Sequence, residues 1–168
     1  MLVAAALIPA PAHAQAVTDN ADARAIVLTG GALVASQTLN FGDIVANTAG
    51  TVTVTATGAV TVTGGVVPLA SIRTPGRFTG SGTRNRLIRL TITPTQITVT
   101  NGTGGSMIVD NFTIGALSGL NQNGNSSNYR IVAANGMFTF NVGARLNIAA
   151  NQPPGNYSGV YSVDFNFQ

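Results

Sequence analysis

Short runs in which apolar and polar residues alternate recur along most of the chain, and Gly, Asn and Pro separate them. Val and Thr alternate strictly over residues 51–55 and 60–63, and Ile88, Leu90 and Ile92 share one face of a later run. Alternation with a period of two indicates strands with one buried face, because successive side chains of a strand point to opposite sides. No stretch has the pattern of an amphipathic helix. The pattern therefore predicts an all-β protein.

Turn-forming residues divide the alternating runs. Pro94 cannot donate to a sheet, so it is expected to separate two strands, and Asn101-Gly102 is a hairpin-type turn. A loop rich in Asn, Gly and Ser is expected over residues 119–128. Further strands are expected at residues 33–41, 77–79, 86–93, 96–100, 107–114, 129–133, 137–142 and 145–148. Many short strands with such turns are typical of a β-sandwich or a barrel.

The last twelve residues contain the clearest strand pattern of the chain. Every second residue of this stretch, from Tyr157 to Phe167, is aromatic, Val or Gly, and the side chains between these residues are polar, with Val160 as the one apolar exception. This pattern predicts a long terminal strand with an aromatic buried face. The residues of that face are Tyr157, Gly159, Tyr161, Val163, Phe165 and Phe167.

The chain begins with a segment typical of export. Residues 2–8 are apolar, two prolines follow, and residues 12–14 (Ala-His-Ala) form a small-x-small cleavage site. The pattern predicts a signal peptide over residues 1–14, with cleavage after Ala14, or after Ala16 as the other option. The first cation is Arg24, so the usual basic start is missing, and a buried apolar segment is the rival interpretation. The run is too short for a membrane span. We expect export through the inner membrane to the cell surface or the extracellular space.

Composition supports one extracellular domain. A chain of 168 residues suffices for one β-sandwich, and its 8% of charged residues is far below the roughly 25% of an average soluble domain. All basic residues are Arg and all acidic ones are Asp. The net charge of +3 reflects eight Arg against five Asp, not a dense basic surface, so nucleic-acid binding is not expected.

The residue types argue against an enzyme. There is no Cys, and His13, the one His, belongs to the predicted signal peptide. This excludes Ser-His-Asp and Cys-His catalysis, and zinc sites built on those ligands, in the mature chain. Turn and surface roles are the expected roles of the carboxylates, and we expect no metal and no cofactor. The carboxylates are Asp19, Asp22, Asp43, Asp110 and Asp164.

Five of the eight arginines fall between residues 73 and 89. One interpretation is contact with a glycan or an acidic polymer. The other is a solvated sheet face and loop, which the scarcity of aromatic residues nearby favours. The arginines are Arg73, Arg77, Arg84, Arg86 and Arg89.

Four segments of the chain resemble segments of a known protein family. They are Leu-Asn-Phe-Gly at 39–42, Gly-Thr-Val-Thr-Val at 50–54, Phe-Asn-Val-Gly-Ala-Arg-Leu at 140–146 and Asn-Gln-Pro-Pro-Gly-Asn-Tyr-Ser-Gly at 151–159. In order and spacing they resemble a family of secreted bacterial proteins catalogued as a domain of unknown function. The resemblance covers roughly residues 33–168. That family is similar to spore coat U proteins and, more remotely, to chaperone–usher pilins.

The resemblance implies an incomplete immunoglobulin-like antiparallel β-sandwich, whose groove the N-terminal extension of the next subunit fills. It also implies a Gly near the fourteenth position from the end and a penultimate aromatic residue, which Gly155 and Phe167 match. The departures are the absent disulfide and Phe in place of Tyr. The terminal strand is then expected to line the groove or to bind an assembly factor through Gly155, Tyr157, Tyr161, Val163, Phe165 and Phe167.

The candidate donor strand lies in residues 15–30, ahead of a sandwich over residues 31–168. Its strongest apolar residues are Ile26, Val27 and Leu28, whereas Asp19, Asp22 and Arg24 interrupt the apolar stripe. The alternative is that this segment forms the first strand of its own complete sandwich. The leading hypothesis is a structural subunit of a pilus-like filament that polymerises non-covalently with other copies. The expected assembly partners are a periplasmic chaperone and an outer-membrane protein. The second hypothesis is a self-complete secreted module that binds a glycan or acidic polymer.

Overall fold

The computed structural model describes residues 31–124 and 127–168. The predicted signal peptide and the candidate donor residues Ile26, Val27 and Leu28 lie outside the described residues. The described parts contain eleven strands and no helix, and therefore no helix that is long and apolar enough to cross a membrane. The strands are β1 (Ala32–Gln37), β2 (Ile44–Val54), β3 (Val60–Pro68), β4 (Gly76–Ser81), β5 (Leu87–Thr93), β6 (Ile97–Thr100), β7 (Ser106–Ser118), β8 (Leu120–Gln122), β9 (Asn128–Ile131), β10 (Met137–Ile148) and β11 (Ser162–Phe167).

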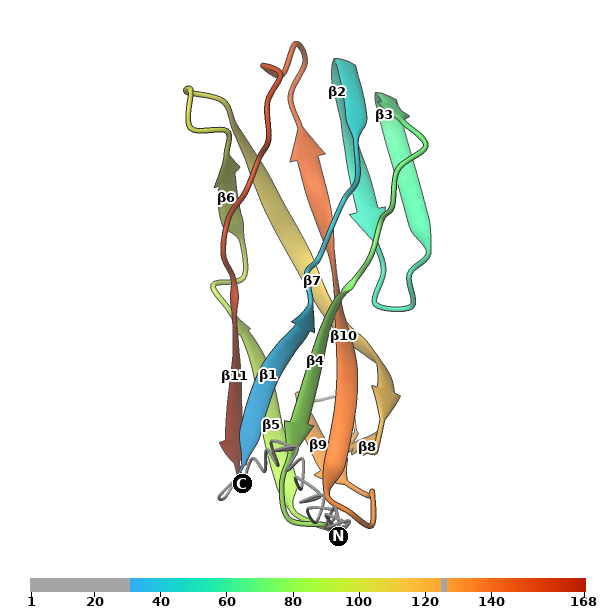
Figure 1. Cartoon of the computed structure of the whole chain (residues 1–168), viewed down its shortest axis with the longest axis vertical. Helices are drawn as coiled ribbons and strands as arrows, with labels where there is room; N and C mark the ends of the chain where they lie inside the picture. The colour runs from blue at the N-terminus through green and yellow to red at the C-terminus, as the bar shows by residue number, and fades with distance from the viewer. Residues whose placement is uncertain (1–30, 125–126) are drawn as a thin grey trace, which may run out of the picture.

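The larger sheet is organised around β10 (Figure 1). One edge of β10 pairs with β7, which in turn pairs with β6. The other edge is shared: β4 pairs with Met137–Val142, and β2 pairs with Ala144–Ile148. Strand β1 extends the sheet beyond β4, and β3 extends it beyond β2. The sheet is therefore split on one side into a lower branch, β4 and β1, and an upper branch, β2 and β3.

The smaller sheet has the order β11-β5-β9-β8 and covers only the lower half of the larger one in the view of Figure 1. All strand pairs of both sheets are antiparallel. The all-β antiparallel sandwich expected from the alternation is confirmed, and the strands do not close into a barrel.

The core follows this division and consists of two clusters. The lower cluster joins both sheets, because Ile88, Leu90 and Ile131 of the smaller sheet pack with Phe138 and Phe140 of β10. In the upper cluster all the fully buried side chains come from the larger sheet. The half-buried residues that pack against them come from the same sheet or, as Leu39, Phe41 and Tyr157 do, from segments outside the strands. The upper half is thus a single sheet whose apolar face has no second sheet over it.

Several strand boundaries differ from the sequence-based expectation. The terminal strand is shorter than expected, because β11 covers only Ser162–Phe167, and β1 ends at Gln37 and not at Phe41. Strand β10 is continuous, although a break at Gly143 was expected. A Cβ at Gly143 would overlap the backbone of Ala56, so a glycine at this position lets the chain at residues 54–56 lie close to β10 without interrupting the strand. Strand β2 begins at Ile44, seven residues before the strict alternation, and β8 lies inside the expected loop.

Candidate functional site, a groove between two open edges

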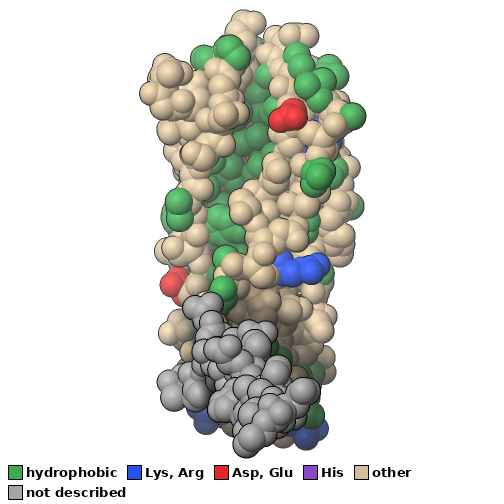
Figure 2. Space-filling model, viewed as in Figure 1, with side chains coloured by type: hydrophobic (Ala, Val, Ile, Leu, Met, Phe, Trp, Pro, Cys, Tyr) green, Lys and Arg blue, Asp and Glu red, His purple; other side chains and the backbone are tan. Residues whose placement is uncertain are grey.

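An apolar groove with a volume of about 930 Å³ runs through the upper half of the molecule. Figure 2 shows it as a hollow whose bottom is formed by hydrophobic side chains. Residues 37–47 form one wall and residues 152–161 form the other. The floor is the uncovered apolar face of the larger sheet, with Ile97 and Val99 of β6, Met107 and Val109 of β7, and Leu146 and Ile148 of β10.

The first wall is the chain between β1 and β2. Asn40 exchanges two backbone hydrogen bonds with Thr74, of 2.8 and 3.0 Å, which fix this segment beside the continuation of β4. Arg73 fastens the next turn, because its guanidinium donates hydrogen bonds to the carbonyl oxygens of Asp43, Leu69 and Ser71. The wall is therefore held from behind, on the side away from the groove.

The second wall is the chain that leads into β11. Ser158 exchanges two backbone hydrogen bonds of 3.0 Å with Thr100 at the end of β6. Gly159 crosses β6 so closely that a Cβ on it would lie 2.9 Å from the carbonyl oxygen of Thr98 and 2.9 Å from Val99 Cγ1. This contact explains why the aromatic face of the terminal segment contains one glycine.

A network of side chains fixes the upper end of the second wall. The Tyr157 hydroxyl donates to the carbonyl oxygen of Pro153 at 2.6 Å and accepts from the Gln152 amide at 2.9 Å. The Asn101 amide nitrogen lies 3.3 Å from both the Tyr157 hydroxyl and the carbonyl oxygen of Pro154. These bonds tie the turn at residues 152–157 to the loop between β6 and β7.

Both walls direct unpaired main-chain groups toward the opening. In an antiparallel pair, a residue that exchanges both bonds with its partner is flanked by residues whose N–H and C=O groups point the other way. Asn40 and Ser158 are such residues, so the main-chain groups of Leu39, Phe41, Tyr157 and Gly159 face the groove. Within the described residues none of these groups has a hydrogen-bond partner. The groove thus has the shape and the open edges of a missing strand.

Tyr161 closes the lower end of the groove. Its ring packs against Phe112 and Phe78, with centroid distances of 5.1 and 6.1 Å. A Cβ at Gly76 would overlap its hydroxyl, which has no hydrogen-bond partner among the described residues. Burial raises the pKa of Tyr161 to about 12. The hydroxyl is therefore a neutral donor at the boundary between the groove and the lower core.

The segments that form the groove fall within one family model, a domain of unknown function named DUF4402, which matches residues 32–167. The chain belongs to the DUF4402 family. No curated protein and no solved structure matches it. The sequence-based resemblance to a family of unknown function is confirmed over nearly the expected residues, whereas the matching model does not itself name spore coat proteins or pilins.

Sequence reasoning singled out six residues of the terminal segment, and only the first of them line the groove of this DUF4402 domain. Gly155, Tyr157 and Tyr161 line it. Val163, Phe165 and Phe167 lie further down, half-buried against the lower cluster, and Phe165 packs on Phe138 at a centroid distance of 5.8 Å. The groove residues that sequence reasoning missed, such as Met107 and Leu146, come from strands distant in sequence.

The five arginines between residues 73 and 89 do not form one cluster in the DUF4402 domain. Arg73 is bound to the loops behind the groove, and Arg77 donates to the Asn141 side chain on the larger sheet at 3.2 Å. Arg84 and Arg86 are exposed in the loop between β4 and β5, and Arg89 is exposed on β5. In the described part of the chain no group of three His, Cys, Asp or Glu side chains is placed to hold a metal ion.

Proposed function

We propose that this chain is a structural subunit of an extracellular filament, in which residues 15–30 of one copy occupy the groove of the next. The observation that supports it best is the pair of open edges, at Leu39–Phe41 and Tyr157–Gly159, on either side of an apolar floor. An extended segment placed between them would bond to both edges and bury its apolar face. The resemblance to pilins, given by the sequence motifs, points to the same mode of assembly.

The candidate donor has a suitable length and composition. The thirteen residues from Val17 to Thr29 span about 43 Å when extended, at roughly 3.3 Å per residue. Ile26 and Leu28 would share one face of that strand. Burial of each stabilises the complex by about 1.5–3 kcal/mol, before the cost of ordering the segment.

The position of Gly31 favours a donor from another copy. A Cβ at Gly31 would lie 2.6 Å from the Phe167 ring and 2.7 Å from the Phe165 ring, so β1 begins beside the end of β11, at the end of the molecule opposite the groove. To reach its own groove, the preceding segment would have to reverse direction and run back along the whole of β1. The segment of a second copy is free of this restraint.

Deletion of residues 15–29 from the mature protein tests the proposal. Negative-stain electron microscopy and unheated against boiled SDS gels should show filaments and a heat-labile ladder for the intact chain, and neither for the deletion variant. A synthetic peptide of residues 15–29 should then bind the deletion variant one to one and raise its melting temperature. A peptide with Ile26→Asp and Leu28→Asp is the matched control and should not bind. Normal filaments from the deletion variant would refute the proposal.

A further inference from the structure

The outer face of the smaller sheet carries two rows of guanidinium and amide side chains. Ile88 and Tyr129 are buried partners, so the residues next to them in sequence, Arg89 and Arg130, point to the opposite, outer face. The strand register places Asn166, Arg89 and Asn128 side by side in one row. It places Leu87, Arg130 and Asn121 in the adjacent row.

Two further arginines lie in the loop at the lower end of the smaller sheet. Arg84 and Arg86 are exposed in the loop that precedes β5. Arg86 lies over the Phe167 ring at 5.9 Å, and because Phe167 is the register partner of the buried Ile88, Arg86 lies at the open end between the two sheets and not on the outer face. Arg130 donates a hydrogen bond of 2.8 Å to the carbonyl oxygen of Asn85 in this loop. Figure 2 shows basic side chains at this end. We call Arg89 and Arg130 the basic face.

No arginine of the basic face forms an ion pair with a carboxylate among the described residues. The one ion pair in the described parts of the chain is between Arg145 and Asp110, on the other sheet. Asp164, the acidic residue of the smaller sheet, lies on the same outer face in the row next to Arg89, opposite Thr91, and accepts a hydrogen bond from the Thr93 hydroxyl at 2.8 Å. The guanidinium groups of the basic face are therefore available to an external anion.

We propose that the basic face binds an acidic polysaccharide that carries carboxylate groups, such as a polyuronate. Guanidinium groups bind carboxylates in a bidentate geometry, and the amides of Asn121 and Asn166 suit the hydroxyl groups of sugars. One row crosses β11, β5 and β9, and the other crosses β5, β9 and β8, so together they present an extended surface, which fits a linear chain better than a small compact ligand.

Two other kinds of polyanion suit this surface less well. Single-stranded nucleic acids require aromatic rings on which bases stack, whereas Tyr129 is buried and Phe167 lies half-buried beneath Arg86. A membrane surface requires exposed apolar side chains next to the cations, and the two rows contain no large exposed hydrophobic residue. The basic face also lies away from the groove, so it stays open whether or not the groove is filled.

The test is binding of the full mature chain to alginate, a polyuronate, with neutral dextran and duplex DNA as comparison polymers. Arg89→Gln and the double variant Arg89→Gln/Arg130→Gln remove charge from the basic face. Arg77→Gln is the matched control, because it removes one exposed guanidinium from the other sheet. Thermal unfolding of each variant confirms that it is folded.

Alginate should bind and neutral dextran should not. Arg89→Gln should weaken binding about two- to fivefold and the double variant about tenfold, whereas Arg77→Gln should leave it unchanged. Absence of alginate binding, or an equal loss in Arg77→Gln, would overturn the proposal. Binding of duplex DNA as tightly as alginate would overturn the assignment to a polysaccharide.

Discussion

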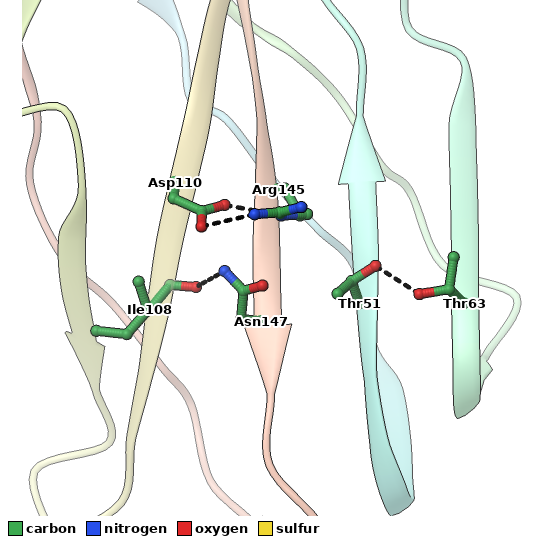
Figure 3. Close-up of polar contacts among 6 residues, drawn as sticks. All are labelled: Thr51, Thr63, Ile108, Asp110, Arg145 and Asn147. Carbon is green, nitrogen blue, oxygen red and sulfur yellow. Dashed lines mark hydrogen bonds and ion pairs between the residues drawn. The ribbon is translucent and has the colours of Figure 1, made fainter.

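Arg145 on β10 and Asp110 on β7 lie directly opposite each other, and the guanidinium donates two hydrogen bonds of 2.9 Å to the carboxylate (Figure 3). Polar contacts continue beside the pair: the Asn147 amide donates to the Ile108 carbonyl oxygen, and the Thr51 and Thr63 hydroxyls are bonded at 2.7 Å. These contacts lie on the face of the larger sheet opposite the groove. The contacts of Arg145 and Asn147 join β10 to β7, which carry the floor of the groove, and the Thr51–Thr63 bond joins β2 to β3.

The Asp110–Arg145 pair predicts a stability change in acid. The hydrogen bond from Arg145 lowers the pKa of Asp110 below its ordinary value of 3.8. A lowered carboxyl pKa contributes stability that is present above the ordinary pKa and is lost as the pH falls through the folded value. Asp110→Asn should therefore lower the melting temperature at pH 7. The difference from the parent protein should shrink toward pH 2. A difference that stays constant over this range would contradict the prediction.

Tyr161 predicts a stability change in alkali. Because burial raises its pKa to about 12, the folded state keeps the phenol neutral while the unfolded chain ionises near pH 10. Stability is then fully present below pH 10 and falls as the pH rises toward 12. Tyr161→Phe should lose less stability than the parent protein between pH 9 and pH 11.5, as measured by denaturant unfolding. Burial also raises the pKa of Tyr129, so some alkaline loss should remain in the variant. Identical alkaline losses in both proteins would be evidence against a buried phenol at Tyr161.

The close packing of Gly159 against β6 predicts that one added methyl group at this position destabilises the protein. A Cβ at this position would lie 2.9 Å from Thr98 O and Val99 Cγ1, so Gly159→Ala should force the wall away from β6. We expect a loss of about 1–3 kcal/mol in the free energy of unfolding, as for other overpacked sites. Ser158→Ala, at the neighbouring exposed position, is the control and should change stability by less than about 0.5 kcal/mol. Equal stability of the two variants would show that the wall is not packed in this way.

Much of the fold follows from local sequence patterns. The Val/Thr alternation of residues 51–54 and 60–63 predicts β2 and β3, because a half-buried strand requires that period. Pro94 separates β5 from β6 as expected. The alternation fails at residues 44–50, where Ile44 and Val45 are followed by small and polar residues in the first half of β2. Pairing with the end of β3, through a register shift between Ala46 and Gly50, holds them in the sheet.

The candidate site depends on contacts that one sequence does not specify. The groove joins residues 37–47 to residues 152–161, more than one hundred positions apart. Which strand lies beside which is decided by the packing of the whole domain. Asp110 illustrates the same point: a turn or surface role was expected, yet it lies within β7 and pairs with Arg145. The cluster of arginines in sequence likewise separates in space, and Arg130, from a different strand, shares the outer face of the smaller sheet with Arg89.

Disulfide crosslinking tests the central claim, that the N-terminal segment of one copy fills the groove of another. The chain has no cysteine, so introduced pairs are unambiguous. One preparation carries Ser158→Cys on the exposed side of the second wall, and another carries Ile26→Cys, Val27→Cys or Leu28→Cys. Neighbouring strands lie about 4.8 Å apart, within the range a disulfide can bridge.

After mixing and mild oxidation, a non-reducing gel should show a covalent dimer of the two variants for at least one donor position. Thr61→Cys, on the outer face of β3, replaces Ser158→Cys in the control preparation, and this mixture should give no covalent dimer of the two variants. A dimer that forms with Ser158→Cys and not with Thr61→Cys is the result this account predicts. Absence of a mixed dimer for all three donor positions would contradict it.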